Sequence, residues 1–227
     1  MAEDTPGTEA MKLVIATVHP TLKDLGFRKR KHGFNRTTED GLTHVIHFQR
    51  GQKPGIYDQF TVNIGVFIPE AFLIANPSWD VPAFINEFDC QIRQRIGLVI
   101  GDRDIWWDLS EEDPEELGGN LRSYISGPVL DWIDKRARSR DAMLDFYERS
   151  EEQRQVDQAM AVVAAEQGDK HRAKRFMQRA LDSIGAMARA DERQATLHQG
   201  WIDMLRQSHI EPYGLVVDYP VIEPARG

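Results

Sequence analysis

A cluster of basic side chains at residues 27–36 is the feature of this sequence best suited to bind a ligand. It reads Phe-Arg-Lys-Arg-Lys-His-Gly-Phe-Asn-Arg, in a chain whose formal net charge is −8. Arg28, Arg30 and Arg36 could contact phosphate groups or the acidic surface of another protein. The same charges could instead form a solvated sheet edge that discourages edge-to-edge pairing, or could pair with the acidic run 108–116 of this chain. The sequence leaves these interpretations open.

The spacing of the cluster limits which of its charges can act together. Two short strands are predicted here, at 27–31 and 34–38. Strand alternation sends the two arginines of the first strand, Arg28 and Arg30, to one face and its lysines to the other. We therefore expect these two arginines to act together, with Arg36 as the next candidate.

Cys90 is the single thiol of the chain, and Arg93 and Arg95 follow it closely. A helix predicted over 81–97 would place Arg93 about one turn from Cys90, and a nearby cation can lower the pKa of a thiol. However, no histidine lies at a local spacing typical of a general base. A free cysteine on an amphipathic helix is usually a small buried side chain. The sequence therefore favours a protein that is not an enzyme, and leaves open an enzyme of unrecognised type.

Two neighbouring tryptophans, Trp106 and Trp107, could form a recognition surface because tryptophan is favoured at binding hot spots. Such a pair is more often one core residue beside a half-buried neighbour. The seven histidines form no HExxH motif, and neither a phosphate-binding glycine loop nor a nucleophile elbow is present. The sequence therefore predicts no metal and no cofactor. His44 shares the apolar face of a predicted strand and is expected to be a hydrogen-bonded core residue.

The elements that must position these residues begin with an amphipathic helix over 8–25, whose apolar residues recur every three or four positions. Four strands follow, at 27–31, 34–38, 42–49 and 60–68, and the last shows the cleanest alternation. The helix over 81–97 is expected to direct Phe84, Ile85, Phe88, Ile92 and Ile96 inward. From about residue 120 to 207 the pattern is helical. The predicted fold is α+β: an N-terminal helix on a four-stranded antiparallel sheet, followed by a mostly helical C-terminal part.

Three regions are predicted from these patterns. They are an α+β domain over 1–138, a helical hairpin or bundle over 139–209, and an extended, proline-bounded tail over 210–227. Within the helical region, the spacing of small and apolar residues over 153–183 resembles the hairpin of tetratricopeptide repeats. No second copy is found, and one such unit cannot form a solenoid.

Five short motifs occur in a characteristic order along the first part of the chain. They are Gly26-Phe-Arg-Lys, Phe34-Asn-Arg, Phe60-Thr-Val-Asn-Ile-Gly-Val, Cys90-Gln-Ile-Arg-Gln-Arg-Ile-Gly and Trp106-Trp-Asp-Leu. Together they resemble a bacterial family known as domain of unknown function 4304, over roughly residues 8–140. The resemblance implies an α+β fold with an antiparallel sheet, and it implies no activity.

Composition limits the function classes further. The pI of about 5.4 argues against a general nucleic-acid binder, because such proteins need a net basic surface. A single cysteine, together with an N-terminus that lacks signal-peptide features and apolar runs too short to span a bilayer, predicts a cytoplasmic protein without membrane contact. The leading hypothesis is a non-enzymatic module that binds another protein, with a regulatory or immunity role in a defence locus as one form. The alternative is binding of nucleic acid or a phosphorylated ligand through the cluster at 27–36. The sequence predicts no particular homo-oligomer.

Overall fold

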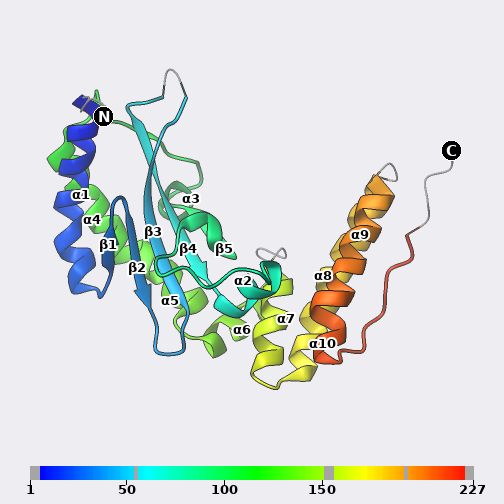
Figure 1. The fold of residues 1–227 in the computed structure, drawn as a ribbon. Helices are drawn as coiled ribbons and strands as arrows, with labels where there is room; N and C mark the ends of the chain where they lie inside the picture. The colour runs from blue at the N-terminus through cyan, green and yellow to red at the C-terminus, as the bar shows by residue number, and fades with distance from the viewer. Residues whose placement is uncertain (1–5, 54–55, 151–155, 192–193, 223–227) are drawn as a thin grey trace. The chain divides into compact units, whose positions relative to one another are not determined.

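The structure is a computed structural model that describes residues 6–53, 56–150, 156–191 and 194–222. Its tertiary contacts divide the chain into two compact units. The first consists of Met1–Ile68 with Pro82–Ser139, and the second of Pro69–Val81 with Arg140–Gly227. The first unit contains the sheet and the second is helical (Figure 1). The domain boundaries predicted near 138 and 209 stay predictions.

The first unit is an α+β fold with an antiparallel sheet. Its strands are β1 (Arg28–Arg30), β2 (Gly33–Thr37), β3 (Thr43–Arg50), β4 (Gln59–Phe67), β5 (Ile92–Arg95) and β6 (Trp107–Asp108). The order is β1-β2-β3-β4-β5, and β6 pairs with β4 beside β5. Its helical elements are α1 (Pro6–Asp24), η1 (Glu87–Asp89), α3 (Ile96–Ile100), α4 (Pro114–Tyr124), η2 (Ile125–Val129) and α5 (Leu130–Ala137).

One face of the sheet is apolar and is covered by helices (Figure 1). The rings of Phe34, Phe48 and Phe60 follow one another across β2, β3 and β4, with centroids 5.9 and 6.2 Å apart. On α1, the ring of His19 packs 5.9 Å from Phe34. The side chain of His44 is 1% exposed, and its Nε2 lies 2.8 Å from the carbonyl oxygen of Ala137 at the end of α5. The core therefore lies between this face and the helices, and His44 is a hydrogen-bonded core residue as predicted.

The structure contradicts the helix predicted over 81–97. This stretch forms the short 3₁₀-helix η1 and the strand β5, and the Phe88 ring, expected to point inward, is 67% exposed. The reason lies in β4, which is buried from Phe60 to Phe67 and whose second edge must find backbone partners. Strands β5 and β6 both pair with that edge. The sheet consequently has two more strands than the four predicted.

The turn between β1 and β2 contains one strained residue. Arg30 pairs with Gly33, so the loop is only Lys31 and His32. Lys31 has φ of 53°, the left-handed region that favours glycine, and no other non-glycine residue of the described ranges has a positive φ. The turn thus holds a charged side chain at its tip at a conformational cost.

The second unit consists of helices and a tail. Its elements are α2 (Pro69–Ala75), α6 (Arg140–Arg149), α7 (Asp157–Glu166), α8 (Lys170–Ala190), α9 (Ala195–Leu205), η5 (Arg206–Ile210) and α10 (Glu211–Tyr213). Helices α7 and α8 form an antiparallel hairpin through Gly168, whose φ is 81°. Residues 153–155 of the predicted hairpin lie outside the described residues, and its likeness to a tetratricopeptide repeat stays a prediction.

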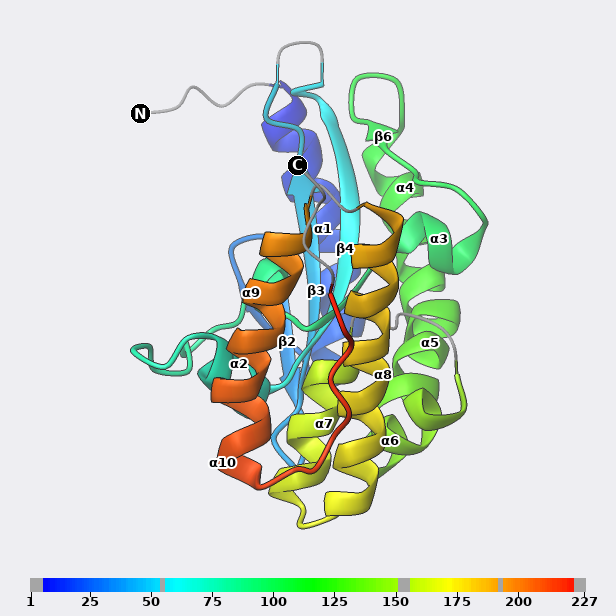
Figure 2. The same ribbon diagram turned by 90° about the vertical axis from the view of Figure 1, so that its right-hand side faces the viewer.

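The extended tail runs beside α8 (Figure 2). The side-chain amide of Gln178 donates to the carbonyl oxygen of Asp218 at 2.9 Å and accepts from its backbone N–H at 2.8 Å. The ring of Tyr219 also lies beneath the guanidinium of Arg206, 4.8 Å away. Residues 223–227 of the predicted tail lie outside the described residues. In the described part of the chain, no helix has the length and apolar composition needed to cross a bilayer.

Candidate anion-binding site

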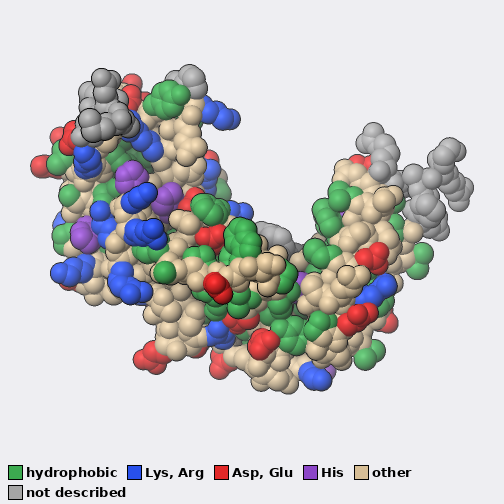
Figure 3. Space-filling view, in the orientation of Figure 1, with side chains coloured by type: hydrophobic (Ala, Val, Ile, Leu, Met, Phe, Trp, Pro, Cys, Tyr) green, Lys and Arg blue, Asp and Glu red, His purple; other side chains and the backbone are tan. Residues whose placement is uncertain are grey.

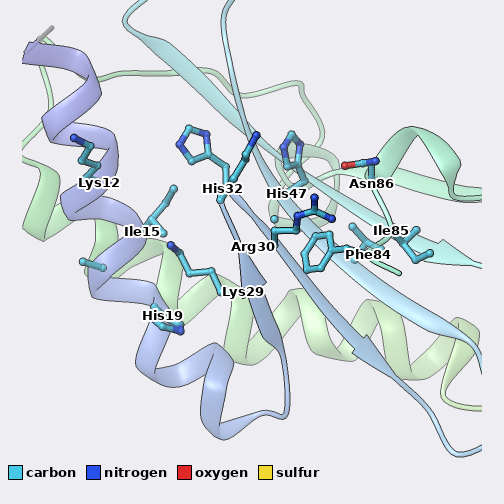
Figure 4. A pocket seen from close by; sticks show the side chains of 14 residues that line it. Lys12, Ile15, His19, Lys29, Arg30, His32, His47, Phe84, Ile85 and Asn86 are labelled. Carbon is cyan, nitrogen blue, oxygen red and sulfur yellow. The ribbon is translucent and has the colours of Figure 1, made fainter. Parts of the chain in front are cut away.

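A recess of about 650 Å³ lies around the β1–β2 hairpin, between α1 and residues 84–86 (Figure 4). Its nitrogen-bearing side chains that can carry positive charge are Lys12, His19, Lys29, Arg30, Lys31, His32 and His47. Its remaining lining is Ile15, Ala16, Gly33, Val45, Phe84, Ile85 and Asn86. No acidic side chain is among these lining residues. Lysine, arginine and histidine side chains gather on this face of the first unit, as Figure 3 shows.

The first wall of the recess comes from α1 and the hairpin. Lys12, Ile15 and His19 are three or four residues apart, so they share one face of α1. Across from them, all three residues of β1 are exposed. The Arg30 guanidinium lies 5.8 Å from the centre of the Phe84 ring, which joins the hairpin to the second wall.

The second wall is the segment 84–87, and the sheet holds it in place. The Asn35 amide donates to the carbonyl oxygen of Ile85 at 3.0 Å and accepts from its backbone N–H at 2.7 Å. The Phe84 ring lies over Gly33, where an added Cβ would be 3.1 Å from the ring. A carboxylate oxygen of Glu87 is 3.0 Å from Nδ1 of His47. Asn35 is only 5% exposed. The sequence carries no signal for this contact, because neighbouring residues alone do not reveal that an asparagine is buried.

The electrostatics of the recess follow from its excess of cations. The pKa of His32 is lowered, first by partial desolvation and then by the nearby positive charges of His47 and Lys29. The pKa of Glu87 is lowered too, mainly because its carboxylate is hydrogen-bonded to His47. The recess therefore disfavours an additional proton on His32 and would favour an entering anion.

The register confirms that Arg28 and Arg30 share a face, because they pair with Asn35 and Gly33 while Lys29 pairs with Phe34. Arg30 lines the recess, whereas Arg28 lies two residues away along the strand.

Arg36 does not belong to the site. It pairs with His44 on the helix-covered face, and its guanidinium lies 3.1 Å from the Nδ1 of that residue. It also lies 4.8 Å from the centre of the Phe27 ring and 3.8 Å from a carboxylate oxygen of Asp134. The prediction that Arg36 would join Arg28 and Arg30 is wrong, because a one-residue difference in strand position reverses the face.

The other candidate residues lie at the opposite edge of the sheet from β1, on or next to β5 and β6. The guanidinium of Arg95 is 5.0 Å from the centre of the Trp106 ring and 3.5 Å from a carboxylate oxygen of Asp104. Trp107 packs against Phe60 with centroids 5.4 Å apart. Arg93 is exposed. The structure therefore brings Arg95 and Trp106 together, and separates both from the recess.

The acidic run 108–116 does not neutralise the basic cluster. Asp108 lies in β6, which pairs with β4, so β2, β3 and β4 separate it from β1. Among the described residues, no ion pair involves the side chains of residues 28–31. The basic hairpin thus keeps its charge at the surface.

Cys90 is 6% exposed and packs against β4, where a Cβ added to Gly65 would lie 2.6 Å from its sulfur. Burial raises the pKa of this thiol, and the neighbouring Asp89 and Glu87 raise it further. The predicted helix that would have placed Arg93 one turn away does not form. These features are typical of an inert structural cysteine.

We expect a thiol reagent such as iodoacetamide to modify Cys90 of the native protein at least about a hundredfold more slowly than the urea-unfolded chain, because modification requires exposure of a thiolate. Mass spectrometry of timed samples measures both rates. Comparable rates in the two states would contradict the buried position.

The remaining chemistry-bearing residues form no metal site that the structure can identify. In the described ranges, histidine, cysteine and acidic side chains do not gather in a group of three or more suited to a metal ion. The recess is therefore the strongest candidate site.

A family model described as "Domain of unknown function (DUF4304)" matches residues 18–135, just over half of the chain. The chain belongs to this family. The DUF4304 match contains all six strands, together with most of the lining of the recess. No curated protein and no solved structure matches the chain.

Proposed function

We propose that this DUF4304 protein binds a phosphate-bearing ligand in the recess beside the β1–β2 hairpin. One observation carries the proposal: the recess is lined by four lysine or arginine side chains and three imidazoles, and by no acidic side chain. An anion placed there would meet several hydrogen-bond donors in a partly desolvated site.

The shape of the recess indicates a ligand with an organic part as well as a phosphate. Its volume of about 650 Å³ lies within the usual range of roughly 300–1,000 Å³ for small-molecule sites. Ala16 and Phe84 give it an apolar surface, while Lys29 and Lys31 lie on the hairpin. The left-handed backbone of Lys31 adds support, because such strain is often found at functional sites.

Titration calorimetry with inorganic pyrophosphate at low ionic strength tests the proposal. We expect saturable binding by the native protein, and an affinity at least about tenfold lower for the double variant Lys29→Ala with Arg30→Ala. The matched control is Arg122→Ala with Lys174→Ala, which removes two exposed charges elsewhere. Absence of binding, or an equal loss in the control, would reject the site.

Binding should also depend on pH. Because the fold lowers the pKa of His32 while a bound anion favours its protonated form, affinity should rise as pH falls from about 7.5 to about 5.5, by roughly threefold to tenfold. His32→Gln should flatten this rise, although His19 and His47 also line the recess. A sulfonated probe keeps its own charge constant over this range, so the protein alone supplies the change. An affinity independent of pH would contradict the placement of His32.

The lowered pKa of His32 also affects the stability of the free protein. The unfolded chain takes up a proton at His32 more readily than the folded protein does, so the free energy of unfolding decreases as pH falls below about 6.5.

Contact with another protein is a second candidate, favoured by one feature of the helical unit. Leu197, Trp201 and Met204 follow one another at four- and three-residue spacings on α9 and are 47, 37 and 49% exposed. Such a stripe is typical of a helix that packs against a partner. A regulatory or immunity role would be one form of this contact. A native pull-down tests it: Trp201→Ser with Met204→Ser should remove a stoichiometric partner that the native protein retains.

A further inference from the structure

The face of the sheet opposite the helices carries two rows of side chains that begin and end on arginine. Residues paired across antiparallel strands share a face. The first row is Arg30–Gly33–His47–Asn63–Arg95 and the second is Arg28–Asn35–Val45–Gly65–Arg93. The four arginines therefore mark the two edges of one face. At about 4.8 Å between strands, these edges are roughly 20 Å apart.

The segment 84–90 crosses this face between the arginines. It is attached to β2 through Ile85 and Asn35, to β3 through Glu87 and His47, and to β4 through Cys90. Figure 4 shows its first residues beside His47. At its centre, the Phe88 ring is 67% exposed. An aromatic ring thus faces solvent between Glu87, which pairs with His47, and Asp89, above a surface whose edges carry arginines.

Both edges also combine an arginine with an aromatic ring. Arg30 lies 5.8 Å from the centre of the Phe84 ring, and Arg95 lies 5.0 Å from the centre of the Trp106 ring. Rings next to cations are the arrangement with which proteins bind single strands, because bases stack on the rings while the cations meet phosphates. An acidic peptide would use the cations and leave the exposed ring without a stacking partner.

We propose that the phosphate-bearing ligand is a single-stranded nucleic acid, which begins in the recess and crosses the segment 84–90 with a base stacked on Phe88. This inference rests on the proposed function and names its ligand. A mononucleotide would fill the recess alone, whereas a strand of about four or more nucleotides would reach Arg93 and Arg95.

Fluorescence anisotropy with labelled oligothymidylates of increasing length, in competition with pyrophosphate, tests the inference. Affinity should rise with length until the strand spans both edges, and then level off. If four phosphates are neutralised, the logarithm of the affinity should fall against the logarithm of salt concentration with a slope of about −3. Inorganic polyphosphate of equal charge should bind more weakly, because it cannot stack.

Phe88→Ala should lower the affinity for the longer oligonucleotides about tenfold, because a base loses the ring on which it stacks, and should leave pyrophosphate binding unchanged. Because Phe88 is exposed, its removal should not unfold the protein. The matched control is Tyr57→Ala, which removes a 52% exposed ring from the β3–β4 connection. Phe88→Trp should retain binding, and its fluorescence should be quenched by oligonucleotide and not by polyphosphate.

The outcomes separate the two proposals. Pyrophosphate binding with no gain in affinity with length overturns the inference and leaves the proposed function. Equal or tighter binding of polyphosphate, of duplex DNA or of polyglutamate overturns the inference as well, and the last result would identify an acidic protein partner. If neither pyrophosphate nor oligonucleotide binds, both proposals fail.

Discussion

Replacing Asp157 by asparagine should lower the free energy of unfolding by about 3 kcal/mol, because it leaves a half-buried arginine without its counter-charge. Asp157 is fully buried at the start of α7 and receives two hydrogen bonds from the Arg179 guanidinium on α8, one from Nε at 3.1 Å. The same guanidinium donates to the carbonyl oxygens of Tyr147 at 2.9 Å and Glu148 at 3.3 Å. One side chain thus joins α6, α7 and α8, and urea unfolding followed by circular dichroism measures its loss.

Two further variants make this prediction specific. Asp182→Asn changes an exposed aspartate on α8, the helix that carries Arg179, and should alter stability by less than about 0.5 kcal/mol. The double variant Asp157→Leu with Arg179→Met removes both charges and should recover most of the loss, because an apolar pair of similar size avoids the desolvation penalty. Equal effects of Asp157→Asn and Asp182→Asn would show that the ion pair adds nothing.

Replacing Asn35 by alanine should cost about 3 kcal/mol of stability and also weaken the binding of pyrophosphate. The substitution leaves both the N–H and the carbonyl oxygen of Ile85 without their partner, and each unpaired buried group costs roughly 1–3 kcal/mol. Because Ile85 and Phe84 form a wall of the recess, a displaced wall should lower the affinity. Asn35 acts by positioning the wall and is not itself a ligand contact.

Asn120→Ala is the matched control, since Asn120 is exposed on α4 and should be nearly neutral. Chemical denaturation gives the loss of stability, and calorimetry at a temperature well below the transition gives the affinity of the folded fraction. An Asn35→Ala protein that is destabilised but binds pyrophosphate normally would show that the wall does not form part of the site.

Much of the fold could be predicted from local patterns. The first helix and the strands up to β4 follow from three-to-four and two-residue periodicities that neighbouring residues alone determine. The stretch 81–97 could not be predicted in this way. Its apolar residues fit a helix, but β4 has an edge that requires a partner, and only the assembled sheet reveals that requirement.

The candidate site, like the fold, could be predicted only where a single strand determines it. Alternation correctly placed Arg28 and Arg30 on one face, since that depends on one strand only. The contributions of Lys12 and His19 from α1, and of the wall held by Asn35, depend on packing between distant segments. Arg36 was misassigned because its face relative to Arg28 depends on the register of β1 with β2, which pairs Arg28 with Asn35. Phe88 carried an apolar signal that the sequence could not distinguish from a core residue.

The close approach of Cys90 to Gly65 links two positions that are far apart in the sequence. A side chain at residue 65 would occupy the space that the sulfur now fills, so the two positions cannot both be enlarged. Among relatives with the same strand pairing, the residue types at these positions should therefore vary together, with an alanine or serine at 65 accompanied by a glycine at 90. Such paired substitution in a sequence alignment would indicate that the segment crossing the sheet keeps its place throughout the family.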